Sequence, residues 1–263
     1  MTLVHTQQAA GVATVTMNRP ERLNTMTDPF LEELLAALEQ VADDRGVRAV
    51  VLRGAGSAFC AGGDLKAGVG GGVGDAGSLS TATGNLRRFM RIAQLLHLMP
   101  KPTIAAVHGA CAGAGLSLAC AADLRYASRS AVFVTAFLKV GMTGDFGGTW
   151  TLPRIVGRSR AREAYLLGDR IDARKALDWG LVTEVLDSDD ELHQRVEDLA
   201  RGLAAGPTEA QAGVKANLND GESLGFVEAL DREAARHIRS SRSVDAVEAT
   251  KAFLEKRVPT FHR

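Results

Sequence analysis

Two glycine-containing segments have residue types and a spacing that could bind a carbonyl oxygen through the backbone. They are Phe59–Leu65, with Gly62-Gly63 at its centre, and His108–Gly115. Each follows a short apolar run typical of a strand, and each leads into a segment that can start a helix. Small residues let a ligand approach the unpaired N–H groups of such turns. Two converging N–H donors form an oxyanion hole, which stabilises negative charge on a carbonyl oxygen.

The elements that must position these turns alternate between strand-like and helix-like patterns. Strands are expected at 12–17, 49–52, 103–107 and 124–127, and helices after Thr27 or Asp28 and over 86–99. Such alternation predicts an α/β fold with helices packed on a largely parallel sheet. From about residue 158 helical patterns dominate, at 158–167, at 173–179 and on to about 257, with one short strand at 181–185. We therefore divide the chain into a core, 1–200, and a helical C-terminal region, 201–263.

Composition excludes several classes of function. The 263 residues carry 31 basic and 31 acidic side chains, so nothing indicates a general attraction to nucleic acid or to an anionic membrane. The longest apolar runs are far shorter than the roughly 20 residues that span a bilayer, and no signal peptide is visible. The three cysteines form neither a disulfide framework nor a metal-binding spacing. A cytoplasmic protein without a metal site is expected.

An ordered set of motifs gives the chain a family resemblance that runs from about Val12 to about Lys256. The motifs are Asn18–Asn24, Phe59–Leu65, Lys101–Gly109, Ala122–Ala127, Gly147–Thr149 and Ala176–Val182. In this order they resemble the enoyl-CoA hydratase/isomerase family, also called the crotonase family. The resemblance implies a crotonase-like spiral of ββα units and an acyl-CoA thioester substrate, with CoA arriving as part of the substrate and no other cofactor. It also implies a homotrimer or homohexamer in which 201–263 serves as the trimerisation region.

The same resemblance assigns roles around the two turns. The N–H groups of Gly63 and Ala114 would hold the thioester oxygen while an enolate forms. Ala61 and Gly113 would adjoin the substrate, and Asp64 would support the first turn without transferring protons. Family hydratases use two glutamates, and the matching positions here are Ser117 and Phe137. Neither side chain exchanges a proton near neutral pH, so the two-glutamate hydratase mechanism is not expected. Ser117 could still line the acyl pocket.

One carboxylate remains near the expected site, Asp145, at a position where some isomerases of the family carry an acid. If Phe137, Phe146 and Trp150 wall the acyl pocket, burial would raise the pKa of Asp145 and suit it to carrying a proton. The alternative is that Asp145 caps a helix beginning at Phe146, because aspartate is a favoured N-cap. The two roles are compatible.

Four further features have expected roles. Arg22 and Lys256 occupy basic positions that in the family can approach the CoA phosphates, and solvated surface charge is the alternative. The glycine-rich tract 68–77 is expected to form a mobile lid or pocket rim, or else a solvated linker. His108 is expected to hydrogen-bond the turn that follows it, and Cys60 and Cys111 to be small buried thiols.

The sequence thus indicates an acyl-CoA enzyme that isomerises an enoyl-CoA, with Asp145 as acid and base. Three alternatives stay open. They are hydration by an altered mechanism in which Asp145 activates water, an aryl-CoA dehalogenase-like substitution with Asp145 as nucleophile, and a non-catalytic CoA-binding role.

Overall fold

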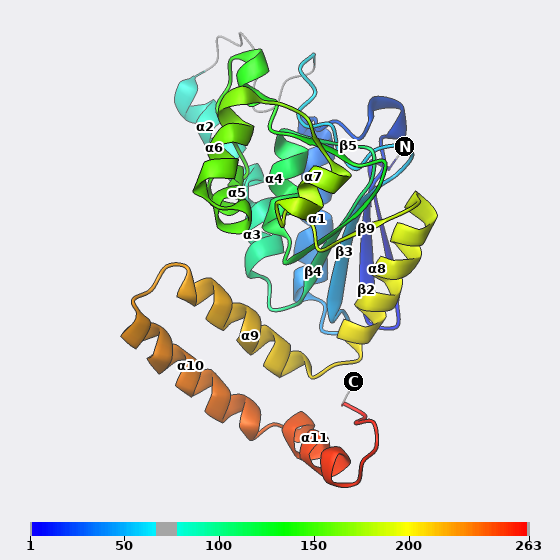
Figure 1. Cartoon of the computed structure of the whole chain (residues 1–263), viewed down its shortest axis with the longest axis vertical. Helices are drawn as coiled ribbons and strands as arrows, with labels where there is room; N and C mark the ends of the chain where they lie inside the picture. Colours follow the sequence, from blue (N-terminus) through cyan, green and yellow to red (C-terminus); the bar gives the residue numbers. More distant parts are fainter. Residues whose placement is uncertain (1, 67–77, 262–263) are drawn as a thin grey trace.

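A computed structural model describes residues 2–66 and 78–261 (Figure 1). The glycine-rich tract 68–77, for which a lid was expected, lies outside the described residues.

A six-stranded sheet forms the centre of the core. Its order is β1-β2-β3-β4-β6-β9, with β1 (Val4–Ala9), β2 (Val12–Met17), β3 (Ala49–Gly54), β4 (Thr103–Val107), β6 (Leu124–Ser128) and β9 (Glu184–Leu186). All neighbours pair in parallel except β1 and β2, which form an antiparallel hairpin. A second sheet of three short strands has the order β5-β7-β8, with β5 (Ala110–Ala112), β7 (Val132–Val134) and β8 (Ile171–Asp172). The alternating pattern in the sequence correctly predicted a largely parallel sheet.

Helices surround the two sheets and continue beyond them. The 3₁₀ turns are η1 (Pro20–Arg22) and η2 (Phe137–Val140). The helices are α1 (Asp28–Asp43), α2 (Leu79–Phe89), α3 (Arg91–Leu98), α4 (Ala114–Ala121), α5 (Gly148–Val156), α6 (Arg158–Leu167), α7 (Ala173–Asp178), α8 (Asp189–Ala204), α9 (Thr208–Gly221), α10 (Phe226–Ser241) and α11 (Val244–Leu254).

Each face of the large sheet has its own apolar layer. On one face α8 buries Leu192 and Val196 against β2, β3, β4 and β6. The other face packs against α1 and α4, and α4 is buried along its whole length. Thr27 caps α1 by accepting a hydrogen bond from Phe30 N at 3.4 Å, as its position before the apolar stripe predicts. Burying one large apolar side chain of such a layer contributes about 1.5–3 kcal/mol.

Two expected elements differ from the structure. The helix expected over 86–99 is two helices, because α2 ends at Phe89 and α3 begins at Arg91. The strand expected at 181–185 is instead β9, Glu184–Leu186. Leu181 and Val182 are buried in the core without strand pairing, so their apolar character reflects core packing and not a place in the sheet.

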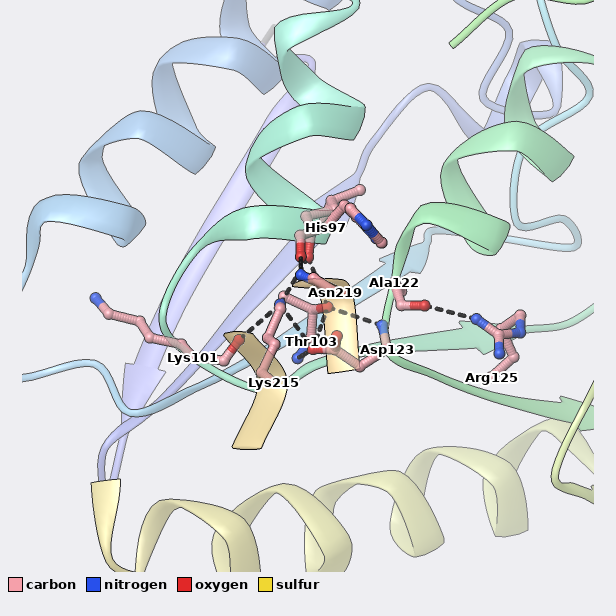
Figure 2. A network of polar contacts seen from close by, with 9 residues as sticks. His97, Lys101, Thr103, Ala122, Asp123, Arg125, Lys215 and Asn219 are labelled. Carbon is pink, nitrogen blue, oxygen red and sulfur yellow. Dashed lines mark hydrogen bonds and ion pairs between the residues drawn. The ribbon is translucent and has the colours of Figure 1, made fainter. Parts of the chain in front are cut away.

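A buried lysine attaches α9 to the core (Figure 2). Lys215 Nζ donates to Leu96 O at 3.0 Å, to Lys101 O at 3.1 Å and to Asp123 Oδ2 at 2.8 Å. The same carboxylate oxygen accepts from Thr103 N at 2.8 Å. Burial lowers the pKa of Lys215, and the Asp123 carboxylate opposes that shift. Two of the sequence motifs, 101–109 and 122–127, therefore meet in a network that anchors the C-terminal helices.

Helices α9, α10 and α11 form an arm that extends from the core (Figure 1). A cavity of about 570 Å³ lies between the core and α9, with lining residues from α3, α5 and α9. Helix α10 runs beside α9 and has no buried residue. Among the described helices, none combines the length and apolarity needed to cross a bilayer.

Candidate active site

The two glycine-containing turns lie side by side because their backbones pair. Cys60 N donates to Ala110 O at 3.0 Å, and Ala112 N donates to Cys60 O at 2.9 Å. A Cβ built on Gly62, whose φ is +94°, would lie 2.9 Å from Ala112 O. Only glycine therefore allows this close approach of the two strands. Residues fifty positions apart in sequence become neighbours at one edge of the core.

Two backbone N–H groups at this edge are available to a ligand. Gly62 O accepts from Met26 N, and Asp64 N donates to Met26 O, both at 2.8 Å. Gly63, between them, directs its own N–H away from Met26, as alternate residues of a β-bridge do. Ala114 is the first residue of α4, so its N–H has no acceptor within the helix. Within residues 2–66 and 78–261 neither N–H has a hydrogen-bond acceptor.

The first turn is stabilised by contacts of Asp64. It was expected to lead into a segment that can start a helix. Leu65 and Lys66 form a turn, residues 67–77 lie outside the described part of the chain, and α2 begins at Leu79. A salt bridge supports the turn, with Arg19 Nη1 2.9 Å from Asp64 Oδ2. Asp64 Oδ1 also accepts from Lys66 N at 3.1 Å. This geometry suits the structural role expected of Asp64.

Asp145 lies on a strained loop that leads into α5. Phe146 has a φ of +44°, a left-handed conformation that costs a non-glycine residue roughly 1–2 kcal/mol. The Phe146 side chain is fully buried, and its burial offsets that cost. The helix begins at Gly148 with Gly147 as N-cap and no side-chain cap. The expectation that Asp145 caps a helix starting at Phe146 is therefore wrong.

The Asp145 side chain is half-buried, and its carboxyl group is incompletely hydrogen-bonded. Its Oδ1 has no hydrogen-bond partner among the described residues. Burial raises the pKa of Asp145 to about 7, and its own backbone N–H opposes the shift. A carboxyl with a pKa close to neutral can both accept and donate a proton at physiological pH.

Tyr165 is a neighbour of this loop that sequence reasoning missed. Its ring, on α6, stacks on Phe137 with 6.3 Å between ring centroids and an interplanar angle of 11°. A Cβ on Gly148 would lie 2.5 Å from Tyr165 Oη and in contact with Ser117 Oγ. The Ser117 and Phe137 positions, which hold the glutamates of family hydratases, thus both contact Tyr165. The sequence indicated this contact only weakly, through one tyrosine on the same side of a polar helix as Ala161 and Ala164, which are buried.

Gly148 offers a direct check on this packing. Alanine is favoured over glycine in a helix by about 1 kcal/mol, but its Cβ would here meet two hydroxyl groups. We expect Gly148→Ala to lower the free energy of unfolding by about 1–3 kcal/mol through overpacking. The matched control is Gly202→Ala in α8, where no atom lies within 4 Å of the added Cβ. Chemical denaturation should show opposite signs for the two variants, and stabilisation by both would contradict the packing.

Other expected site residues lie elsewhere. Trp150 faces the cavity beneath α9, with His97 5.3 Å away between ring centroids and the Arg154 guanidinium 3.7 Å above its ring. Arg22 lies in η1 on the surface, and Lys256 follows α11. Helix α11 lies on the arm (Figure 1). A single chain therefore does not bring Lys256 to the two turns. Ala61 and Gly113 lie within the turns themselves.

The histidine and cysteines near the turns have structural environments. His108 Nε2 bonds with Gly56 O at 2.9 Å, so its partner is the turn after β3 and not the turn that follows His108. All three cysteines are buried, and burial raises the pKa of Cys60 to about 12 and that of Cys120 to about 11. Such thiols are not nucleophiles at neutral pH. Among the described residues no cluster of three or more His, Cys, Asp or Glu side chains could hold a metal ion.

The raised pKa of Asp145 predicts a pH-dependent penalty on stability. Between about pH 4 and pH 7 the folded protein keeps a proton that the unfolded chain loses, so stability falls as pH rises through this window. A shift of about three pKa units corresponds to a penalty on the order of 4 kcal/mol. Asp145→Asn should remove this stability penalty. The free energy of unfolding of the variant should therefore be higher than that of the wild type at pH 8, but not at pH 4. Denaturation at both pH values checks this, and an equal difference at both would refute the raised pKa.

Comparison with known proteins gives matches over nearly the whole chain. The sequence model described as enoyl-CoA hydratase/isomerase matches residues 7–263. The chain is 42% identical to the 1,2-epoxyphenylacetyl-CoA isomerase of Escherichia coli K12 over 95% of both chains. The chain belongs to the enoyl-CoA hydratase/isomerase family. It is also 40% identical to a candidate enoyl-CoA hydratase of Rhodobacter capsulatus, over 95% of this chain and 94% of that one.

A solved structure of the enoyl-CoA hydratase/isomerase family has the same fold. The crystal structure of a candidate family member from Mycobacterium abscessus superposes with a TM-score of 0.92 at 38% identity, covering 98% of this chain and 99% of that one. The expected crotonase-like fold, with its helical C-terminal region, is confirmed. The chain is thus a crotonase-family acyl-CoA enzyme.

Proposed function

We propose that this protein isomerises an enoyl-CoA, with Asp145 moving the proton. The carboxylate would remove a proton from one carbon of the acyl group and return it, as the acid, to the vinylogous carbon. The observation that carries the proposal is the half-buried Asp145 carboxyl, whose Oδ1 is enclosed without a hydrogen-bond partner among the described residues and whose pKa is raised to about 7. One group can perform both transfers, because its pKa lies near the working pH.

The enolate formed between the two transfers would be held by the N–H groups of Gly63 and Ala114. Their proximity and their lack of acceptors among the described residues support this oxyanion hole. Each such donor contributes about 3 kcal/mol to transition-state stabilisation. The proposed reaction needs no cofactor beyond the CoA of the substrate, since proton transfer and charge stabilisation both come from the chain.

Isomerisation is favoured over hydration by the residues at the two positions where family hydratases carry glutamates. Ser117 and Phe137 replace the two carboxylates that a hydratase would use to activate water and to protonate the α-carbon. Phe137 is buried and stacked on Tyr165, so its side chain excludes water from that position. A single carboxylate in apolar surroundings is sufficient for a double-bond shift.

A second candidate reaction is isomerisation of a ring epoxide. The Escherichia coli relative named 1,2-epoxyphenylacetyl-CoA isomerase is 42% identical to this chain. An acid that protonates an epoxide oxygen or shuttles a ring proton could be the same Asp145. The two candidates share the oxyanion hole and differ in the acyl group.

We also propose that the chain assembles as a homotrimer or homohexamer through its C-terminal arm. Large apolar side chains are exposed on α10 and α11, including Phe226, Val227, Ile238 and Phe253. Such a surface is typical of a protein–protein interface. Assembly could also bring Lys256 of one subunit toward the CoA bound by another, and Arg22 would contact the CoA phosphates from its own subunit.

A substrate panel tests the proposed function. Purified protein is incubated with 2-enoyl-CoA, 3-enoyl-CoA and 1,2-epoxyphenylacetyl-CoA, and products are analysed by mass spectrometry and NMR. A product of unchanged mass with a moved double bond, or a rearranged ring, supports isomerisation. A product heavier by one water indicates hydration and contradicts the proposal.

A further inference from the structure

Tyr165 and Ser117 have no role in the proposed proton transfer, yet both pack against the loop that carries Asp145. The loop begins at Gly144 and ends at Gly148, and Tyr165 contacts both ends. A Cβ on Gly144 would lie 3.3 Å from Tyr165 Cε1, and one on Gly148 would lie 2.5 Å from Tyr165 Oη. The ring therefore packs across the base of the loop that carries the carboxyl.

The Tyr165 hydroxyl connects this loop to the oxyanion turn. A Cβ on Gly148 would also lie 2.3 Å from Ser117 Oγ, and the Ser117 hydroxyl is close enough to Tyr165 to oppose the rise in the pKa of the phenol. Ser117 is on the first turn of α4, and its hydroxyl is 3.4 Å from Gly113 O, the residue before Ala114. A chain of contacts thus runs from α6 through two hydroxyls to the start of α4, where the second oxyanion donor lies.

An aromatic ring, a thiol and one carboxyl group lie near the Tyr165 hydroxyl. Phe137 stacks on the tyrosine ring, and Cys60 and Cys120 are the buried thiols nearest Asp145 and Tyr165. Asp145 is the acidic group close enough to act on Tyr165, and its charge helps burial to raise the pKa of the phenol. The phenol is therefore neutral at physiological pH and remains a hydrogen-bonding group.

We infer that the Tyr165–Ser117 hydroxyl pair is a positioning device that holds the Asp145 loop closed at a fixed place relative to the N–H of Ala114. The inference rests on the proposed function, since it explains how one carboxylate is held over an enolate. Misplacement of a catalytic group by about 1 Å can cost 100-fold in rate, so a hydroxyl that touches no reacting atom can still matter.

Tyr165→Phe and Ser117→Ala test the inference, because each removes one hydroxyl and keeps the rest of the side chain or a small residue in its place. We expect either variant to lower kcat about tenfold with KM changed less than twofold. The double variant should lose little more than either single variant, since both remove the same link. The control is Tyr126→Phe, the chain's other tyrosine, which is buried beneath Arg195 on the opposite face of the large sheet. The inference would be overturned if kcat were unchanged in both single variants, or if the loss in the double variant equalled the product of the two single losses.

A second readout separates this inference from the proposed function. The Asp145 carboxyl is titrated in the resting protein by infrared or ¹³C NMR difference spectroscopy, with Asp145→Asn to identify its signal. Opening of the loop should admit water and lower the pKa of Asp145 by at least one unit in Tyr165→Phe and in Ser117→Ala, but not in Tyr126→Phe. An unchanged titration in both variants overturns the inference. If the wild type isomerises nothing while these shifts appear, the proposed function has failed and the positioning role stands.

Discussion

Asp145→Asn is expected to lower isomerase turnover by about 10²- to 10⁴-fold, the range that one general acid–base group contributes. The amide has nearly the shape of the carboxyl but cannot accept a proton from carbon. The half-buried site should accept the change, since Oδ1 has no hydrogen-bond partner to lose among the described residues. Steady-state kinetics and acyl-CoA binding by calorimetry would be measured together. We expect kcat to fall while the dissociation constant changes little.

The control for this variant is Asp178→Asn, which removes the charge of an exposed aspartate on α7. It should leave kcat, KM and stability unchanged, because surface substitutions rarely alter stability by more than about 0.5 kcal/mol. If Asp145→Asn binds acyl-CoA and turns it over as the wild type does, Asp145 is not the acid–base group. If neither protein turns over any substrate, a non-catalytic CoA-binding role gains support.

Ala114→Pro is expected to lower kcat/KM by about 10²- to 10³-fold, because it deletes one oxyanion donor. Proline is well tolerated at the first position of a helix, where the N–H has no intrahelical partner. The preceding residue, Gly113, has φ +53° and ψ −123°, and as a glycine it adopts this conformation without a Cβ. The variant should therefore fold and lose activity. Circular dichroism and thermal unfolding would accompany the kinetics.

Ala114→Gly is the matched control, since it keeps the N–H and removes only a methyl group. Its kcat/KM should stay within a few-fold of the wild type. Equal activity of the proline and glycine variants would show that the Ala114 N–H does not bind the thioester oxygen. Equal loss in both would indicate that the methyl group or the backbone of α4 matters, and not the donor.

Much of the fold was predictable because its signals are local. The strand Val12–Met17 and the helix capped by Thr27 have clear periodicity, and the structure contains both. The strand β1 was not predicted, because only Val4 of its six residues is buried and the alternation is therefore weak. The break between α2 and α3 was not predicted, because no glycine or proline stands at that point in the sequence.

The site was predictable where it depends on the backbone and unpredictable where it depends on packing. The resemblance assigned Gly63 and Ala114 as donors, and the structure brings the two turns that contain them together. The helix-cap role expected for Asp145 was wrong, because the strained backbone at Phe146 delays α5 to Gly148. Tyr165 was missed, since its contact with Ser117 joins two helices that are far apart in sequence. Trp150 was expected at the acyl pocket, yet it faces a cavity on the α9 side, a direction that the sequence could not reveal.

Isotope tracing in D₂O tests the central claim most directly. Wild-type protein and Asp145→Asn are incubated with 3-enoyl-CoA, and the product is examined by mass spectrometry and by ²H NMR. The account predicts a 2-enoyl-CoA that carries no added water and at most one deuterium at C4, formed by the wild type and not by the variant. A hydrated product, or the same double-bond shift in Asp145→Asn, would contradict it.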